Sequence, residues 1–386
     1  MTVGGGVGAG RTLRENAARC VEPRRTTGPS GPGAASPNPA TLRPMRKKTK
    51  ATSVDIAHLA GVSQATVSRV LSGSPLVNAE TRKRVEAVVR ELNYKVDRHA
   101  SSLRRQRSGT LALLLFEDPT PDESHINPFF LSMLGSITRA CARHGQDLLI
   151  SFQQLSDDWA ADYEDSMKAD GLILLGYGDY LAYQGKLQRL VEQGTRFVRW
   201  GAVLPDQPGL SIGCENLGGG RQAGAHLLAL GRTRVAFLGD ASSHYPEFLD
   251  RYLGCEQALN EAGLALDRGL QVDAESSEDA GRAAALELLA RARPFDAVFA
   301  ASDLIAIGAM RALTEQGLRV PEDVSVIGFD DLPMARFAHP PLTTVFQDTK
   351  QAGELLVETL MQLIRGEDAS SQRLPTTLVV RKSCGG

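Results

Sequence analysis

Residues 52–94 read TSVDIAHLAGVSQATVSRVLSGSPLVNAETRKRVEAVVRELNY, and this stretch predicts three short helices. Thr52, followed three residues later by an aspartate, is a capping box, which predicts that the first helix begins there. A glycine turn precedes a second helix at 64–71, and Asn78 can cap a third helix at about 79–92. Two short helices across a tight turn, with a third packed behind them, predict a helix-turn-helix unit.

Charge is distributed unevenly along the 386 residues, although the net charge is only −2. Up to Arg107 the chain has 20 Lys and Arg against 7 Asp and Glu, whereas the remainder has 23 basic and 38 acidic side chains. A basic head on an acidic body indicates that the head meets a polyanion and the body does not.

The composition also argues against several classes of protein. Five widely spaced cysteines without a C-x-x-C pair argue against a disulfide scaffold and a structural zinc site. No run approaches 18 apolar residues and the N-terminus lacks a secretory signal, so we expect a cytoplasmic protein, at the nucleoid and without a membrane partner. The absence of G-x-S-x-G, P-loop and H-E-x-x-H motifs argues against an enzyme, and we expect no cofactor and no metal.

Amino-acid composition and the pattern of apolar residues divide the chain into segments. Residues 1–48 are rich in Gly, Pro, Ala and Arg, which predicts a disordered leader, and Met45 is a candidate for the native start. The helix-turn-helix domain is expected at 49–95 and a hinge or linker at 96–107. Over 108–386, apolar runs of strand length alternate with amphipathic helices, which predicts parallel sheets buried on both faces.

The body is long enough for two such subdomains, with a small-molecule cleft between them. We expect the first subdomain at about 108–214 plus 345–366 and the second at about 215–344 plus 367–383. The strongest strand candidates are 111–116, 147–151, 171–175, 196–200, 235–239, 297–301 and 324–329.

The stretch 52–94 resembles the DNA-binding head of the LacI/GalR family of bacterial transcriptional regulators. The resemblance continues with NPFF at 127–130, RYLG at 251–254, AASDLIAIGAMRAL at 300–313, VPEDVSVIGFDDLPMARF at 320–337 and PPLTTVFQD at 340–348. It implies an all-α helix-turn-helix head and an α/β body of two doubly wound, parallel-sheet subdomains of the periplasmic-binding-protein-like type I. It also implies a homodimeric repressor that binds a palindromic operator in double-stranded DNA and responds to a small-molecule effector, which we expect to be a sugar.

The resemblance assigns DNA contacts to the second helix and its flanks. Gln64 and Ala65 occupy the variable base-reading positions, and Arg69 occupies the common one. Gln can pair with adenine, Ala can touch a thymine methyl group, and Arg can bind guanine or phosphate. The other expected contacts, mainly to phosphate, are Thr52, Ser63, Thr66, Ser68 and Asn78. The alternative from the residues alone is an ordinary helical hairpin with a solvated polar face.

Within the linker, the resemblance implies that Leu103 inserts into the minor groove and that Arg98 holds a nearby phosphate. An apolar wedge can unstack a base step while cations bind the backbone. The alternative is a charged linker whose Leu103 docks on the body.

For the body, the resemblance places an effector in the cleft. The implied contacts are an apolar wall of Phe129 and Phe130, a donor in Arg251, acceptors in Ser302, Asp303 and Asp330, and a weaker candidate in Asp179. Planar aromatic rings and polar groups of this kind suit a sugar.

Each effector candidate also has a structural alternative. The two phenylalanines can belong to the core at a helix start, Asp303 can cap the helix that follows it, and one of Asp330 and Asp331 can be structural. One departure from the family is Ser276, because many sugar-responsive relatives carry an aromatic residue there. An α/β body also occurs in dehydrogenases, kinases and periplasmic binding proteins, so its fold alone does not exclude these classes.

Overall fold

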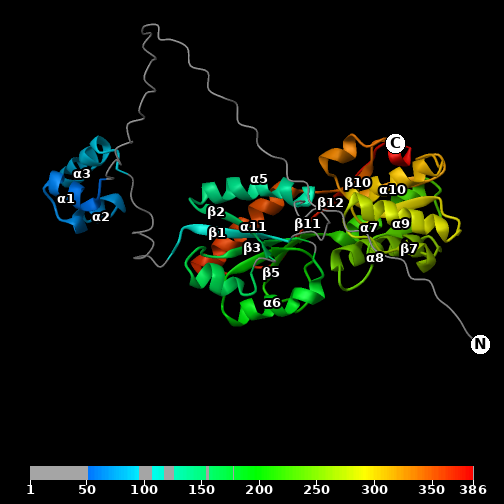
Figure 1. Ribbon diagram of the computed structural model, residues 1–386, viewed down its shortest axis with the longest axis horizontal. Coiled ribbons are helices and arrows are strands. Elements are labelled where there is room, and N and C mark those ends of the chain that lie inside the picture. Colours follow the sequence, from blue (N-terminus) through cyan, green and yellow to red (C-terminus); the bar gives the residue numbers. More distant parts are fainter. Residues whose placement is uncertain (1–50, 95–106, 117–125, 154–155, 177, 386) are drawn as a thin grey trace, which may run out of the picture. The chain divides into compact units, whose positions relative to one another are not determined.

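The computed structural model describes residues 51–94, 107–116, 126–153, 156–176 and 178–385 (Figure 1). The chain divides into two compact units, one ending at Tyr94 and the other beginning at Lys95. The expected leader and its Met45 lie outside the described residues, as do Arg98 and Leu103 of the expected linker.

The first unit consists of three helices, as the sequence predicts. They are α1 (Ser53–Ala60), α2 (Gln64–Leu71) and α3 (Ala79–Glu91). Ile56, Val67 and Val85 contribute one fully buried side chain from each helix to a small common core. Gly61 ends α1 with a φ of 62°, a left-handed conformation that glycine adopts without steric cost. The short turn between α1 and α2 therefore depends on this glycine.

The second unit contains two sheets, each with six described strands. The first has the order β11-β5-β4-β3-β1-β2 and is parallel throughout. Its strands are β1 (Thr110–Leu115), β2 (Asp147–Phe152), β3 (Leu172–Leu175), β4 (Phe197–Trp200), β5 (Leu210–Cys214) and β11 (Gln372–Leu374).

The second sheet has the order β12-β10-β9-β8-β6-β7, and only the pairing of β12 with β10 is antiparallel. Its strands are β6 (Val235–Leu238), β7 (Gln271–Val272), β8 (Ala297–Ala300), β9 (Ser325–Asp330), β10 (Thr343–Gln347) and β12 (Thr376–Val379). All seven strands expected from the sequence are present, with ends that differ by one residue.

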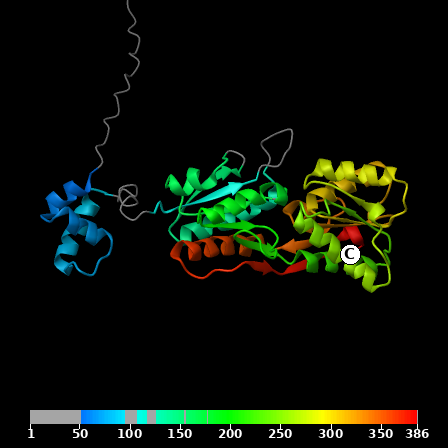
Figure 2. The same ribbon diagram turned by 90° about the horizontal axis from the view of Figure 1, so that it is seen from below.

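The first sheet is covered on both faces because alternate side chains of each strand point to opposite sides. In β1, Leu111 and Leu113 join the core cluster that contains α5 (Pro128–Arg143) and α11 (Thr349–Arg365). Leu114 joins a second cluster with α6 (Tyr180–Glu192) on the opposite face. Figure 2 shows α11, in orange-red, running along the first sheet. The apolar run of β1 after Thr110 is therefore explained by burial on both sides.

Helices also pack against the second sheet. They are α7 (Asn216–Ala229), α8 (Pro246–Glu261), α9 (Glu278–Ala290) and α10 (Asp303–Glu315). Helices α7 and α8 approach closely, because a Cβ added at Gly220 would overlap the backbone of Arg251, and one added at Gly254 would overlap that of Leu217. These glycines fix the position of Arg251 on α8.

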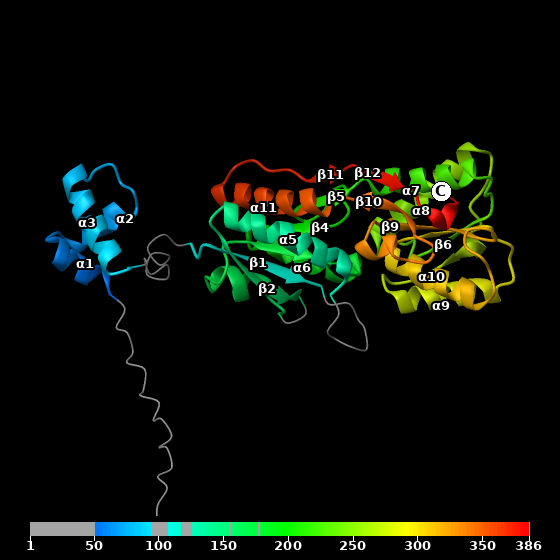
Figure 3. The same cartoon turned by 90° about the horizontal axis from the view of Figure 1, so that it is seen from above.

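The chain passes between the two sheets three times, from β5 to α7, from β10 to α11 and from β11 to β12 (Figure 3). The expected boundary between 344 and 345 therefore falls inside β10, and the segment 367–383 gives one strand to each sheet. Short helical turns lie at Ala160–Asp165, Arg268–Leu270, Pro333–Arg336 and Lys382–Cys384.

Candidate functional site

The outer face of α2 carries the side chains expected to read DNA bases. Val67 and Val70 are buried against the other helices, and Leu71 packs beside them. Gln64, Ala65 and Arg69 are exposed, as is Ser68. The Gln64 amide donates to Ser53 Oγ over 2.9 Å, which orients it across the start of α1. The expected base-reading residues are therefore together on one polar face.

Three of the expected phosphate contacts are also helix caps. Thr52, Ser63 and Asn78 accept hydrogen bonds from the backbone N–H groups three residues later, at 3.3, 3.2 and 2.8 Å. Ser63 Oγ also lies 2.9 Å from Thr66 Oγ1. Caps of this kind place helix N-termini at the surface, where their free N–H groups favour an anion such as phosphate.

In the second unit, Arg251 lies at the centre of a buried polar group. Its side chain is 0% exposed, and its Nε donates to Asn216 Oδ1 over 2.9 Å while Nη1 donates to the carbonyl of Ala301. The Nη1 atom also lies 3.8 Å from Asp330 Oδ1. The guanidinium sits 3.8 Å from the centroid of the Phe329 ring, which is a cation–π contact.

Asp330 ends β9 and faces Arg251. Burial raises the pKa of Asp330 to about 7, although Arg251 and a 2.6 Å hydrogen bond from Gln347 Nε2 act to lower it. Its backbone has a φ of 118°, and that of the next residue, Asp331, is 51°. Two successive non-glycine residues in the left-handed region store strain, which is concentrated at functional sites in proteins.

The neighbouring Asp331 has a different role. Its carboxylate accepts a hydrogen bond from Arg381 at 2.5 Å, and this pair links the end of β9 to the C-terminal segment. Of the two successive aspartates, Asp331 is therefore the one held by a structural ion pair, whereas Asp330 belongs to the Arg251 group.

Ser302 and Asp303 are both fully buried at the start of α10. The alternative that Asp303 caps this helix is wrong, because Ser302 Oγ accepts from the N–H of Ile305 at 3.3 Å and is the cap. Asp303 instead accepts hydrogen bonds from Leu332 N, at 2.7 Å, and from Thr344 Oγ1. Burial raises the pKa of Asp303, and the charge of Asp330 raises it further. Asp303 thus ties α10 to the segments beside β9 and β10.

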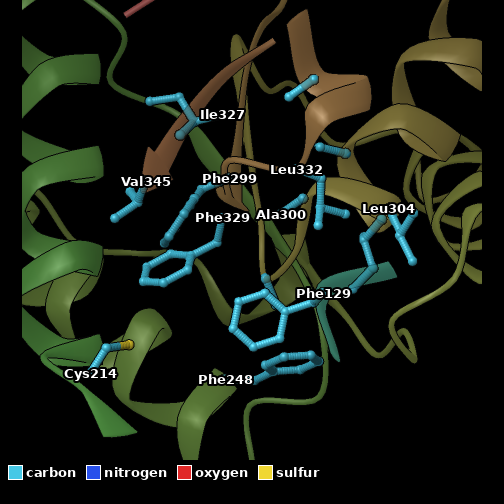
Figure 4. Packing of buried hydrophobic residues seen from close by; sticks show 14 of the residues in the cluster. Phe129, Cys214, Phe248, Phe299, Ala300, Leu304, Ile327, Phe329, Leu332 and Val345 are labelled. Carbon is cyan, nitrogen blue, oxygen red and sulfur yellow. The ribbon is translucent and has the colours of Figure 1, made fainter. Parts of the chain in front are cut away.

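Phe129 and Phe130 start α5 and are buried in the core. Their ring centroids lie 5.4 Å apart in an edge-to-face arrangement, and Phe129 lies 5.7 Å from Trp200. Figure 4 shows Phe129 in one cluster with Phe248 and Phe329, which come from the second sheet and its helices. Phe129 is therefore part of the core and also lies where the two subdomains meet.

The weaker candidate, Asp179, connects the two subdomains at a second place. It caps α6 by accepting from Ala182 N at 3.1 Å, and its Oδ2 lies 2.8 Å from His244 Nδ1. Burial acts to raise the pKa of Asp179, but these hydrogen bonds lower it overall. The N–H of Tyr180 also donates to the carbonyl of His244 over 2.8 Å.

Sequence reasoning missed other polar contacts between the subdomains. Asn127 Nδ2 donates to Ser276 Oγ at 3.2 Å, and Ser276 Oγ donates to Ser302 Oγ at 2.8 Å. The N–H of Ala202 donates to the buried carboxylate of Glu247 over 2.6 Å. For Asn127, its place in the NPFF motif could have indicated such a contact, whereas no sequence feature marked Glu247. Ser276 is thus part of a hydrogen-bonded chain that joins Asn127 to Ser302.

Two further kinds of feature are absent from the described part of the chain. No group of three or more His, Cys, Asp or Glu side chains there could hold a metal ion. No helix in the same residues is long and apolar enough to cross a membrane.

Comparison with known proteins places this architecture in a family. A family model described as bacterial regulatory proteins, lacI family, matches residues 53–97, and one for a periplasmic binding protein-like domain matches 225–384. The transcriptional regulator CelR of Thermobifida fusca is 34% identical over 347 residues, which cover 88% of this chain and all of that protein. The chain belongs to the LacI family. A second LacI-family relative, the ribose operon repressor of Escherichia coli K12, is 31% identical over 333 residues, covering 86% of this chain and 98% of that protein.

Solved structures of the LacI family confirm the fold class. The complex of CelR with cellobiose has a TM-score of 0.64 at 34% identity, and the lac repressor dimer bound to operator and the anti-inducer ONPF has 0.71 at 28%. Each match covers 86% of this chain and 99% of the other. These relatives are transcription regulators, which supports the expectation that this LacI-family chain is not an enzyme.

Proposed function

We propose that the chain is a sequence-specific repressor whose operator affinity is controlled by a sugar bound between the two subdomains. The observation that carries this proposal is the buried group of Arg251, Asp330 and Phe329, which combines donors, an acceptor and an aromatic face where the subdomains meet. A sugar ring offers hydroxyl groups to the first two and an apolar face to the third. The cited relatives include a cellobiose complex and a ribose operon repressor, which supports the choice of ligand class.

Operator binding is proposed for the exposed face of α2, where Gln64, Ala65 and Arg69 are available to base edges. The operator lies in the bacterial nucleoid, so the repressor acts there, in the cytoplasm. Binding of the effector and of the operator is then reciprocally coupled through the body.

A gel shift with the promoter fragments that flank the gene tests the DNA proposal. We expect a sequence-selective complex that weakens steeply with added salt, because counterions are released on binding. A thermal-shift screen with a sugar panel that includes cellobiose and ribose tests the effector proposal, because a bound ligand raises the melting temperature. The proposal fails if no fragment is retained selectively, with or without those sugars.

The same proposal includes a homodimer, since one helix-turn-helix head reads only half of a palindrome. An apolar surface suited to a second copy lies on α5 and β2, which is an edge strand of the first sheet. Leu131 is 46% exposed, Leu149 36% and Ile150 47%. Exposed apolar groups on an edge strand are usually covered by a partner.

Ile150→Lys is expected to convert the dimer to monomers, because a charge on this surface cannot be buried against its copy. Sedimentation velocity measures the change. Leu253→Lys is the matched control, since Leu253 is also an exposed aliphatic residue but lies on α8. A dimer that persists in Ile150→Lys, or an equal loss in the control, would contradict this assignment.

Leu103→Ala is expected to weaken operator binding about tenfold while nonspecific DNA binding changes little, because the proposed wedge acts only on the operator. Fluorescence anisotropy with operator and scrambled duplexes measures both affinities. Leu76→Ala removes an exposed leucine of the head and is the control. Equal losses on both duplexes would show that Leu103 is not a wedge.

A further inference from the structure

Helix α11 accepts a side-chain hydrogen bond from another segment near its end and begins two residues after a strand residue that is bonded to Asp330. Before its start, Gln347 Nε2 at the end of β10 donates to Asp330 Oδ1 over 2.6 Å. Near its end, Arg107 Nη2 donates to the carbonyl of Ile364 over 2.7 Å. Arg107 is the last residue of the expected linker, so α11 lies between the proposed effector site and the point where that linker joins the body.

The packing of α11 makes it a stiff connection. Its 17 residues span about 25 Å at the usual rise per residue. Asp348 caps its start, and Gly366, with a φ of 74°, ends it. A Cβ added at Gly353 would overlap Ser136 of α5, so the two helices are in close contact. A closely packed helix of this kind moves as a unit.

The first residues after the linker are held by a second anchor. The Asp170 carboxylate accepts hydrogen bonds from Ser108 N at 2.5 Å and from Gly109 N at 2.9 Å. Arg107, Ser108, Asp170 and Ile364 all line one small cavity of about 90 Å³. The N–H groups of Ser108 and Gly109 therefore report directly on how firmly the linker exit is held.

We propose that α11 couples the effector site to the linker, with Gln347 and Arg107 as the positioning residues at its two ends. The inference rests on the proposed function, because it assumes that an effector acts at Asp330. A ligand that competes for the Asp330 carboxylate changes its bond to Gln347, and the rigid helix carries that change to Arg107. Such coupling requires an element that both sites bias. Helix α11 begins two residues after Gln347, and near its other end the carbonyl of Ile364 accepts the bond from Arg107.

Amide hydrogen exchange of the full chain, without ligand or DNA, tests the connection. Gln347→Met keeps the side-chain volume but removes the bond to Asp330. We expect the Ser108 and Gly109 amides to exchange roughly fivefold to tenfold faster in this variant, as for the loss of one supporting hydrogen bond. When Arg107 is already replaced by Ala, Gln347→Met is expected to give no further increase in the exchange rate. When Arg107 is replaced by Lys, which keeps a donor, Gln347→Met should again accelerate exchange.

Arg143→Ala is the control, because it removes only an exposed ion pair with Glu354 in the middle of α11. The proposal is overturned if the Ser108 and Gly109 amides do not exchange faster in Gln347→Met. It is also overturned if the acceleration is the same with and without Arg107, or if the amides of β8 are accelerated equally. These readings are taken on the free protein. A failure to retain operator in the gel shift would therefore be a separate result, counting against the proposed function alone.

Discussion

Arg251→Met is expected to abolish the thermal shift that the effector sugar gives with the wild-type chain. The substitution keeps an unbranched side chain of similar bulk but removes the donors that serve Asn216 and the carbonyl of Ala301. It also leaves these two buried acceptors without their donor, which is expected to lower the free energy of unfolding by about 3 kcal/mol. Urea unfolding and thermal shift with the same sugar measure the two effects.

Arg282→Met is the matched control for this change. Arg282 pairs with Glu315 on the surface, where such pairs contribute at most about 1 kcal/mol. Its sugar response should equal that of the wild type. An unchanged dose-response in Arg251→Met would remove Arg251 from the effector site, and an unchanged free energy of unfolding would contradict the importance of its buried contacts.

The stability of the wild-type chain is expected to fall as the pH rises toward and through 7. Burial raises the pKa of Asp330 from 3.8 to about 7, so the folded protein holds this proton where the unfolded chain has released it. The stabilisation is complete below the unfolded pKa and is lost as the pH rises through the folded one. We expect Asp330 to contribute a decrease of about 2 kcal/mol between about pH 5 and about pH 8, which Asp330→Asn should remove. The part contributed by the buried Asp303, whose pKa is also raised, should remain.

Asp323→Asn provides a control of opposite sign. Hydrogen bonds from Arg319 lower the pKa of the partly exposed Asp323 to about 2, so its contribution is lost only in acid. Urea unfolding at about pH 5 and about pH 8 should show the same decrease in the free energy of unfolding for this variant as for the wild type. If Asp330→Asn shows that decrease as well, the pH dependence comes from other groups.

Local signals predicted the head and the strongest strands. The caps at Thr52, Ser63 and Asn78 depend on contacts three residues apart, so the sequence alone places the starts of these helices. Strand β1 is apolar after Thr110 because both of its faces are buried, and this continuous apolar run is also visible in the sequence. Family resemblance added Arg251 and Asp330 as separate candidate effector contacts, and only the structure shows that the two side chains lie together.

Features that depend on distant segments were not predictable. Strand β7 has two residues, and β11 and β12 are short edge strands whose positions depend on pairing with β5 and β10. The hydrogen bond of Asn127 to Ser276 joins residues 149 positions apart. The role of Asp303 depended on the fold of the segment around Leu332, which no spacing rule supplies.

The three crossings of the chain between the sheets determine how the body responds to truncation. Because β11 and β12 follow one another near the C-terminus but belong to different sheets, a nonsense codon at position 372 would remove an edge strand from each. Truncations at or before position 372 therefore cannot inactivate one half of the body while sparing the other, and neither half can be expressed as one uninterrupted fragment.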